Sequence, residues 1–213
     1  MVLALTGFMG CGKSSVGRKL RTLLSCDYVD LVSYIEEAQG RSIPDIFSSE
    51  GEATFRSLEL SALRSLLSSR LSDAPHFSGS SDGILHCGTP DDKPLIISLG
   101  GGTLTTPSCA SLVKENTRCI YLRASIDTLL SNLKEDYASR PMLDGANDEA
   151  ALRRRISSLM DARAAIYEST AALIVDIDPF LSSAATLDSA YDSIARSIAA
   201  KLYKKGTATT PQP

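Results

Sequence analysis

The sequence predicts an α/β fold in which helices cover both faces of a parallel sheet, and three observations carry this prediction. Five short β-rich segments alternate along the chain with segments of helical length. Apolar residues in the longer segments recur at helical spacing. The chain has 213 residues, 43% of them apolar and 22% charged, which is enough to bury one sizeable core. We therefore expect a single domain over residues 1–203.

Each element follows from a local pattern. The expected strands are residues 2–6, 27–31, 94–100, 118–124 and 172–177. Three helices are expected where apolar residues share one face, marked by Val16, Leu20, Leu23 and Leu24, by Leu58, Leu63, Leu66 and Leu67, and by Leu187, Tyr191, Ile194, Ile198 and Leu202. Residues 150–168 carry one further, long helical pattern.

Two segments lack these patterns. Residues 68–93 are rich in Ser, Gly, Pro and Asp, so we interpret them as a surface insertion before the third strand. His76 and His86 lie there without enough companion ligands for a metal site, and we interpret both as solvated loop residues. Residues 204–213 have no apolar periodicity, which predicts a disordered tail.

Charge and cysteine usage narrow the class of protein. The formal net charge is −3 and the pI is near 5.4, which argues against a nucleic-acid partner. The five cysteines show no CxxC pair and no disulfide-dense spacing, as in proteins of a reducing compartment. The N-terminus has no basic leader, and no apolar run approaches the length of a membrane span. We expect a soluble, cytoplasmic protein without a membrane partner.

The segment between the first strand and the first helix has the pattern of a phosphate-binding loop. Residues 7–14 read GFMGCGKS and satisfy G-x-x-x-x-G-K-[ST]. Glycines let consecutive backbone N–H groups turn toward phosphate oxygens, and the helix N-terminus adds the positive end of its dipole. A simple glycine turn would explain Gly7 or Gly12 alone, but not the Lys-Ser pair at this offset. The sequence therefore predicts a nucleoside triphosphate site at Gly10, Cys11, Gly12, Lys13, Ser14 and Ser15, with Lys13 on the β- and γ-phosphates and Ser14 on Mg²⁺.

Five further motifs follow in order along the chain. They are VDLVSYIEE (29–37), SIPDIFSSEGEATFRSLE (42–59), SLGGGT (98–103), SRPML (139–143) and ARAAIY (162–167). Together with the phosphate-binding loop they resemble the shikimate kinase family over about residues 1–177, apart from the insertion at 68–93.

The resemblance implies a fold and an activity. The fold would be a three-layer α/β/α kinase of the nucleoside monophosphate kinase type, with five parallel strands in the order 2-3-1-4-5 and a mobile lid over residues 137–148. The activity would be transfer of the γ-phosphoryl group of ATP to the 3-hydroxyl of shikimate, in the pathway to chorismate and the aromatic amino acids. We expect a monomer, because a small kinase of this type has to open and close.

The resemblance also implies the acceptor site. Arg56 and Arg163 would converge on the carboxylate of the acceptor, where a planar bidentate donor is better than lysine. Glu59, one helical turn after Arg56, would orient it. Gly101 and Gly102 would lie against the acceptor, at the carboxyl end of a strand where such sheets bind ligands. Taken singly, each arginine could be a solvated surface charge, and the glycines could form a simple loop.

Three residues are implied to be catalytic: Lys13, Asp30 and Arg140. Asp30 would hold Mg²⁺ opposite Ser14. Arg140, in the lid, would fold over the phosphates and stabilise the charge that spreads over the transferring group. The run 153–155, three arginines, is interpreted as a solvated helix face without a role.

The chain departs from the family pattern at one substrate-binding position. The family has Asp-x-Asp at the end of the second strand, and here Val32 replaces the second aspartate. That carboxylate accepts hydrogen bonds from the hydroxyls of the acceptor and is the candidate base. A buried hydroxyl left without its acceptor costs about 1–3 kcal/mol, and loss of a general base costs roughly 10²-fold or more in rate.

Three explanations of Val32 stay open. In the first, the chain is a weakened shikimate kinase, since positioning and electrostatics carry most phosphoryl-transfer catalysis. In the second, it phosphorylates a related acid with a less polar group facing Val32. In the third, it is a nucleotide-binding regulator without turnover. Adenylate and gluconate kinases are lesser alternatives, because EGEATFRSLE followed by LGGG counts against both. The retained phosphate-loop residues and arginines favour a working shikimate kinase.

Overall fold

The computed structural model of the protein describes residues 1–71, 84–85, 94–134, 137, 140–143 and 145–203. Within these residues, a six-stranded sheet forms the centre of the protein. The strands are β1 (Val2–Thr6), β2 (Asp27–Asp30), β3 (Ile84–Leu85), β4 (Leu95–Ser98), β5 (Arg118–Arg123) and β6 (Leu173–Asp176). They lie in the order β3-β2-β4-β1-β5-β6. The five predicted strands are all parallel and, numbered among themselves, have the predicted order 2-3-1-4-5. β3 adds an antiparallel edge beside β2 that the sequence did not predict.

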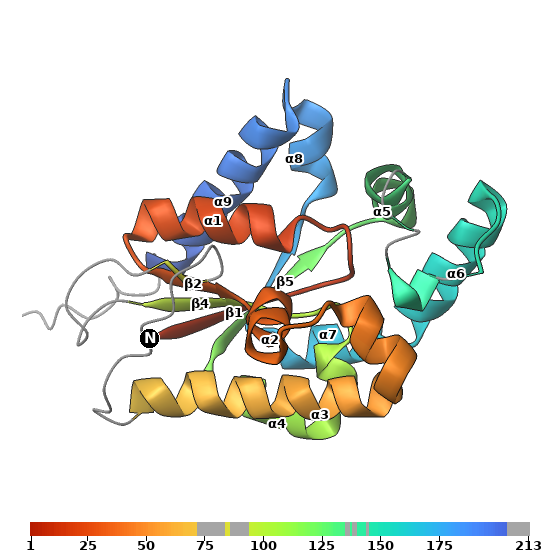
Figure 1. The fold of residues 1–213 in the computed structure, drawn as a ribbon. Helices are drawn as coiled ribbons and strands as arrows, with labels where there is room; N and C mark the ends of the chain where they lie inside the picture. The colour runs from red at the N-terminus through yellow and green to blue at the C-terminus, as the bar shows by residue number, and fades with distance from the viewer. Residues whose placement is uncertain (72–83, 86–93, 135–136, 138–139, 144, 204–213) are drawn as a thin grey trace, which may run out of the picture.

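Helices cover both faces of the sheet, which confirms the three-layer prediction (Figure 1). The cluster on one face includes side chains of α1 (Lys13–Leu24), α5 (Ile126–Leu133), α6 (Glu149–Asp161), α8 (Asp178–Ser183) and α9 (Leu187–Tyr203). The cluster on the other face includes side chains of α2 (Leu31–Gln39), α3 (Ile43–Leu71), α4 (Pro107–Asn116) and α7 (Ala164–Thr170). Two short 3-10 helices, η1 (Thr103–Thr105) and η3 (Pro141–Leu143), follow β4 and α5.

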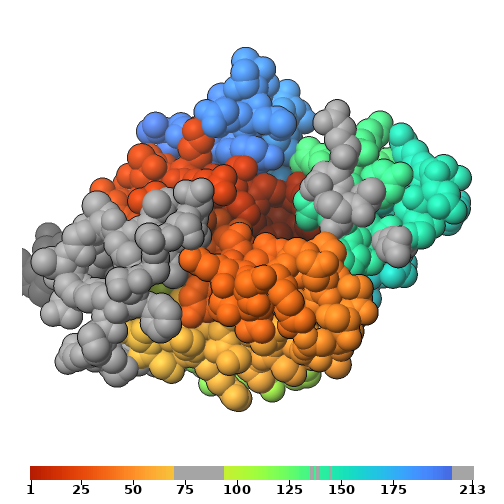
Figure 2. Space-filling view, viewed as in Figure 1, coloured from red at the N-terminus to blue at the C-terminus, as the bar shows by residue number. Residues whose placement is uncertain are grey.

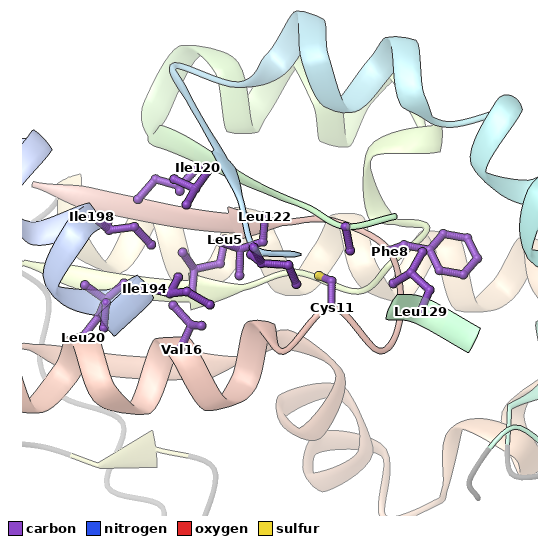
Figure 3. Close-up of a cluster of buried hydrophobic side chains, with 14 of the residues drawn as sticks. Leu5, Phe8, Cys11, Val16, Leu20, Ile120, Leu122, Leu129, Ile194 and Ile198 are labelled. Carbon is purple, nitrogen blue, oxygen red and sulfur yellow. The ribbon is translucent and has the colours of Figure 1, made fainter. Parts of the chain in front are cut away.

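The two cores follow from the alternation of side chains along each strand, because successive residues point to opposite faces of a sheet. Leu3 and Leu5 of β1 pack in the cluster with α1 and α9, whereas Ala4 between them packs in the cluster with α3 and α4. β5 repeats the pattern. Figure 3 shows the first cluster, in which Leu5, Ile120 and Leu122 of the sheet meet Val16, Leu20, Ile194 and Ile198 of α1 and α9.

The strand register brings three loops to one edge of the sheet. Ser98 at the end of β4 is paired with Leu5 of β1 and with Asp30 of β2, so the carboxyl ends of these neighbouring strands lie level. The phosphate-binding loop, Asp30 and the glycines 100–102 therefore begin side by side. This is the edge at which open parallel α/β sheets bind ligands.

The prediction of one long helix over residues 150–168 is wrong. The chain forms α6 and α7, separated by Ala162 and Arg163. The backbone N–H of Arg163 bonds to Met160, and its carbonyl accepts the N–H of Tyr167, so one helix ends and the next begins at this residue. The break turns the Arg163 side chain inward, where the residue is only 4% exposed.

The insertion is shorter than predicted. α3 extends to Leu71, so residues 68–71 are helical, and residues 84–85 form β3. Several expected segments lie outside the described residues. They are the rest of the insertion, the tail at 204–213 and residues 138–139 and 144 of the lid, together with residues 135–136 just before it. Across the described ranges, no helix has both the length and the apolar character needed to cross a membrane.

Candidate active site

The phosphate-binding loop joins β1 to α1 through three glycines with positive φ. Gly7 has φ 143°, Gly10 has φ 79° and Gly12, the N-cap of α1, has φ 82°. These values lie in the region that favours glycine. Neighbouring side chains also exclude a Cβ, which would overlap the ring of Tyr191 at Gly12 and lie 2.8 Å from Leu133 Cγ at Gly10. The loop is thus packed from behind by α9 and α5.

The side chain of Lys13, the first residue of α1, folds back into this loop and is not on the surface. It is 9% exposed, and its ammonium donates hydrogen bonds to the carbonyl oxygens of Gly7 (3.0 Å) and Phe8 (2.9 Å). Cys11 is fully buried with its sulfur directed into the core cluster (Figure 3), and burial raises the pKa of its thiol. Any contact of Cys11 with a phosphate would therefore come from its backbone, while Lys13 carries the charge of the loop.

A side chain outside the loop fixes its shape. Asn132 of α5 donates a hydrogen bond from Nδ2 to the carbonyl oxygen of Gly10 at 2.8 Å. Next to it, Leu133 is the residue that packs against Gly10. No local pattern predicts this support, because Asn132 is 122 residues from Gly10 along the chain.

Two oxygen-bearing side chains meet beside the loop. The Ser14 hydroxyl in the first turn of α1 donates to Asp30 Oδ2 at 2.7 Å. Tyr28 donates to the same oxygen at 3.2 Å, and Asp30 Oδ1 accepts the backbone N–H of Val32 as the N-cap of α2. Burial, together with the Asp30 carboxylate, raises the pKa of Tyr28, so its hydroxyl stays a donor. Ser14 and Asp30 are brought together as the sequence predicted.

Arg56 is held between two carboxylates. Its Nη1 donates to Glu59 Oε2 at 2.6 Å, which is the predicted pairing one helical turn apart. On its other edge, Nε and Nη2 donate to Glu52 Oε1 at 3.1 and 2.7 Å. A Cβ on Gly102 would lie 2.8 Å from Arg56 Cζ, so the guanidinium lies against the glycine turn. Burial alone would lower the pKa of Arg56, but the two carboxylates raise it.

Arg163 reaches the same turn from the start of α7. Its Nη1 donates to the carbonyl oxygen of Gly101 at 3.3 Å, and its guanidinium lies 5.7 Å from the centre of the Phe8 ring. The hydroxyl of Tyr167 also donates to the Gly101 carbonyl. The two arginines predicted to hold one carboxylate therefore border neighbouring glycines of one turn, Arg56 at Gly102 and Arg163 at Gly101.

Val32 borders this site from the first turn of α2 and is half-buried. The position of a Cβ on Gly100 would be 3.5 Å from Val32 Cγ2, 2.7 Å from Glu59 Oε1 and 3.0 Å from Thr103 Oγ1. Thr103 donates to Glu59, and both residues are fully buried. At the position where the family pattern has a carboxylate, this chain presents methyl groups beside the glycine turn.

Arg140 follows α5 in a tight turn. Its backbone N–H bonds to Tyr137 at 3.1 Å and its carbonyl accepts the N–H of Leu143 at 2.8 Å. Leu143 is fully buried, which anchors the second half of the expected lid to the core. Figure 2 shows a hollow on this side of the molecule, where the dark red N-terminal segment lies between the orange α2–α3 segment and the green segment that contains α5.

Comparison with known proteins gives the family. The family model described as "Shikimate kinase" matches residues 9–73 and 85–201. This chain belongs to the shikimate kinase family. The gap in the match, residues 74–84, falls inside the expected insertion.

Relatives and solved structures agree with this membership. The shikimate kinase of Chlorobium limicola is 35% identical over 181 residues, which cover 83% of this chain and 78% of the relative. That of Salinibacter ruber is 35% identical over 175 residues, covering 79% and 74%. The structure of the Acinetobacter baumannii shikimate kinase in complex with shikimate has a TM-score of 0.75 at 25% identity, covering 97% of this chain and 94% of that one. The Bacteroides thetaiotaomicron shikimate kinase, with a TM-score of 0.74 at 23% identity, shares the fold.

This member of the shikimate kinase family brings most of its predicted site residues to one edge of the sheet. The residues placed there are Gly10, Cys11, Gly12, Lys13, Ser14, Asp30, Val32, Arg56, Gly101, Gly102 and Arg163. Ser15 lies half-buried in the first turn of α1. The sequence missed Glu52, Thr103, Asn132 and Tyr167, although Tyr167 stands in the matched motif ARAAIY and could have been found there.

Proposed function

We propose that this shikimate kinase family member transfers the γ-phosphoryl group of ATP to the 3-hydroxyl of shikimate, giving shikimate 3-phosphate and ADP. The observation that carries this proposal is the pair of guanidinium groups at the glycine turn. Arg56 lies against Gly102, and Arg163 donates to Gly101. Planar guanidinium groups bind carboxylates in bidentate fashion. An acceptor with a carboxylate would thereby be held beside the phosphate-binding loop.

The nucleotide would bind across the loop and the N-terminus of α1. The positive φ values of Gly7, Gly10 and Gly12 let the backbone approach phosphate oxygens. Lys13 already reaches the carbonyls of Gly7 and Phe8, and from there its ammonium would contact the β- and γ-phosphates. In this proposal Arg140 closes over the transferring group and stabilises its charge.

The residues next to the loop fit Mg²⁺. Mg²⁺ prefers oxygen ligands and is usually held by one or two protein oxygens together with water and substrate phosphates. The Ser14 hydroxyl and the Asp30 carboxylate lie 2.7 Å apart and supply such oxygens. When bound, the cation would neutralise charge on the phosphates. Tyr28 and the N–H of Val32 orient Asp30 for this role.

In the reaction, the 3-hydroxyl oxygen forms a bond to the γ-phosphorus while the bond to the oxygen that bridges to ADP breaks. Arg56 and Arg163 would orient the acceptor, and this positioning supplies much of the rate. Val32 has no group to accept the hydroxyl proton, so the proton would leave to water or to a phosphate oxygen. We therefore expect a slow shikimate kinase, by roughly 10²-fold or more relative to a chain with a carboxylate there.

Val32 also favours a second candidate function. A valine beside Gly100 suits an acceptor acid that presents an apolar group at this point, whereas a shikimate hydroxyl there would lose its hydrogen-bond acceptor. Gluconate, which carries hydroxyls rather than such an apolar group, is the comparison acid for a kinase of another small hydroxy acid. A regulator without turnover would bind ATP and release no ADP with any acid.

The experiment that tests the proposal is ADP release with ATP and Mg²⁺ in the presence of shikimate or gluconate. It compares the protein with Val32→Asp and with Ser33→Asp, which adds a carboxylate at the next, exposed position. We expect activity with shikimate that rises in Val32→Asp and not in Ser33→Asp. Turnover with gluconate alone supports a kinase for another hydroxy acid and contradicts the shikimate proposal. ATP binding without turnover in all three proteins contradicts both.

The proposal includes the setting in which the enzyme works. All of the residues invoked come from one chain, so a monomer suffices, and the net charge of −3 gives no reason to expect a nucleic-acid partner. We propose a cytoplasmic monomer that acts on small molecules only. Light scattering of the purified protein tests the oligomeric state.

A further inference from the structure

The edge of Arg56 that suits a carboxylate is occupied by a residue of the chain itself. Glu52 Oε1 accepts from both Nε and Nη2, while Glu59 takes Nη1 on the other edge. Two donors on one edge of a guanidinium form the fork that binds carboxylates most strongly. An acceptor acid that uses this fork and the Glu52 carboxylate would therefore compete for the same two N–H groups.

The two carboxylates differ in how firmly they are held. Glu59 is fully buried and also accepts a hydrogen bond from Thr103, so its release would leave a buried charge without a partner. The Glu52 side chain is 49% exposed, and within the described part of the chain its hydrogen bonds go to Arg56 alone. Water can therefore replace Arg56 at Glu52 at little cost, whereas Glu59 has to stay.

The backbone next to Glu52 is suited to such a movement. Gly51 interrupts α3 with φ 81° and ψ 174°, so Glu52 begins the second helical part of α3. A Cβ on Gly51 would have no atom within 4 Å, so the space on that side of the break is open. The start of this second part therefore has an exposed side chain at Glu52 and open space beside Gly51.

We propose that Glu52 is a built-in competitor that occupies the carboxylate-binding edge of Arg56 and has to leave when the acceptor binds. The proposal rests on the proposed function, because it takes Arg56 to be the site of the acceptor's carboxylate. A tethered carboxylate is present at high effective concentration. Simple monocarboxylates would be displaced by it, while an acid that also contacts Arg163 and the glycine turn would prevail.

The test is Glu52→Gln, with Glu50→Gln as the matched control. Glu50 is an exposed carboxylate two residues away that pairs with Arg41 at 2.5 Å and does not contact Arg56. Shikimate affinity is measured by titration calorimetry and as KM in the ADP-release assay. We expect Glu52→Gln to bind shikimate about two- to fivefold more tightly, the scale of a half-exposed ion pair, with kcat unchanged. Glu50→Gln should behave as the unchanged protein.

The sign of the effect separates the competitor from a supporting role. If Glu52 merely orients Arg56, its removal weakens shikimate binding, and that result overturns the proposal. The Arg56 Nε–H signal in NMR spectra reports the pair without any acceptor, and an identical signal in Glu52→Gln would also overturn it. Failure of the proposed function looks different, because shikimate would then bind none of the proteins while the Nε–H signal still changed.

Discussion

Asn132 of α5 and Gly10 of the phosphate-binding loop are joined by a hydrogen bond of 2.8 Å from the side-chain amide to the backbone carbonyl. The bond fixes the peptide unit that follows Gly10, and with it the direction of the next N–H group. Because Arg140 follows α5 along the chain, this helix stands between the phosphate-binding loop that it supports and the expected lid.

Asn132→Ala should therefore weaken nucleotide binding more than it weakens the fold. Loss of one such hydrogen bond costs about 1 kcal/mol, so KM for ATP should rise about fivefold with KM for shikimate unchanged. The control is Asn116→Ala, which removes the same kind of bond, to Leu112 at 2.9 Å, at the end of α4. Equal effects of the two variants on KM for ATP would contradict the role of Asn132 as a support of the phosphate-binding loop.

Tyr167→Phe should affect the acceptor site and leave the nucleotide site intact. The hydroxyl donates to the carbonyl of Gly101, and burial raises the pKa of Tyr167, so it remains a donor across the physiological range. Its loss leaves Arg163 as the other donor to that oxygen, at 3.3 Å. We expect KM for shikimate to rise about three- to tenfold, for about 1 kcal/mol.

The neighbouring ring supplies the control for Tyr167. Tyr121 packs on Tyr167 with ring centres 5.1 Å apart, and Tyr121→Phe removes a hydroxyl without changing the donors to Gly101. Steady-state kinetics with each substrate varied in turn distinguish the two variants. A rise in KM for ATP in Tyr167→Phe would mean that the effect spreads through the fold instead of acting at the glycine turn.

Stability should decline in alkaline solution because of buried thiols. Burial raises the pKa of Cys119 from 9.0 to about 12 and, with the nearby Glu59 charge, that of Cys109 to about 11. Above pH 9 the unfolded chain loses these protons first, so the stabilisation present below pH 9 is lost as the pH rises toward the folded values. Urea unfolding at several pH values should show a free energy of unfolding that falls with pH.

Cys119→Ala should reduce this slope by about 1.4 kcal/mol per pH unit, the value for one proton. The comparison is Val113→Ala, which removes apolar atoms from the same cluster without removing a titrating group. It should lower the free energy of unfolding equally at every pH. Parallel curves for the two variants would show that Cys119 does not titrate as its burial requires.

The sequence predicted the fold well because the relevant signals are local. Consecutive apolar residues such as Leu3, Ala4 and Leu5 are typical of a strand buried on both faces, and the glycine pattern before Lys13 indicates the phosphate-binding loop. The break between α6 and α7 was missed because neither Ala162 nor Arg163 interrupts a helix by its own chemistry. The break places Arg163 where its Nη1 donates to the carbonyl oxygen of Gly101.

Contacts between distant segments explain what the sequence missed in the site. The hydrogen bond from Thr103 to Glu59 joins residues 44 apart in the sequence, and that from Tyr167 to Gly101 joins residues 66 apart. No local spacing predicts either pair. The pairing of Arg56 with Glu59 was predicted because three residues along a helix place both side chains on one face. The same argument applies to Glu52, which lies four residues before Arg56 on the same helix. This second pairing was not predicted, although the spacing allows it.

The small strand β3 also keeps the edge of β2 from pairing with another copy of the protein. Without it, β2 would end the sheet with unpaired N–H and C=O groups, which are a template for pairing with another chain. Ile84 and Leu85 instead pair with Val29 and Tyr28 in the antiparallel direction. β3 thereby covers this edge of β2, and deleting Ile84 and Leu85 would expose an aggregation-prone border.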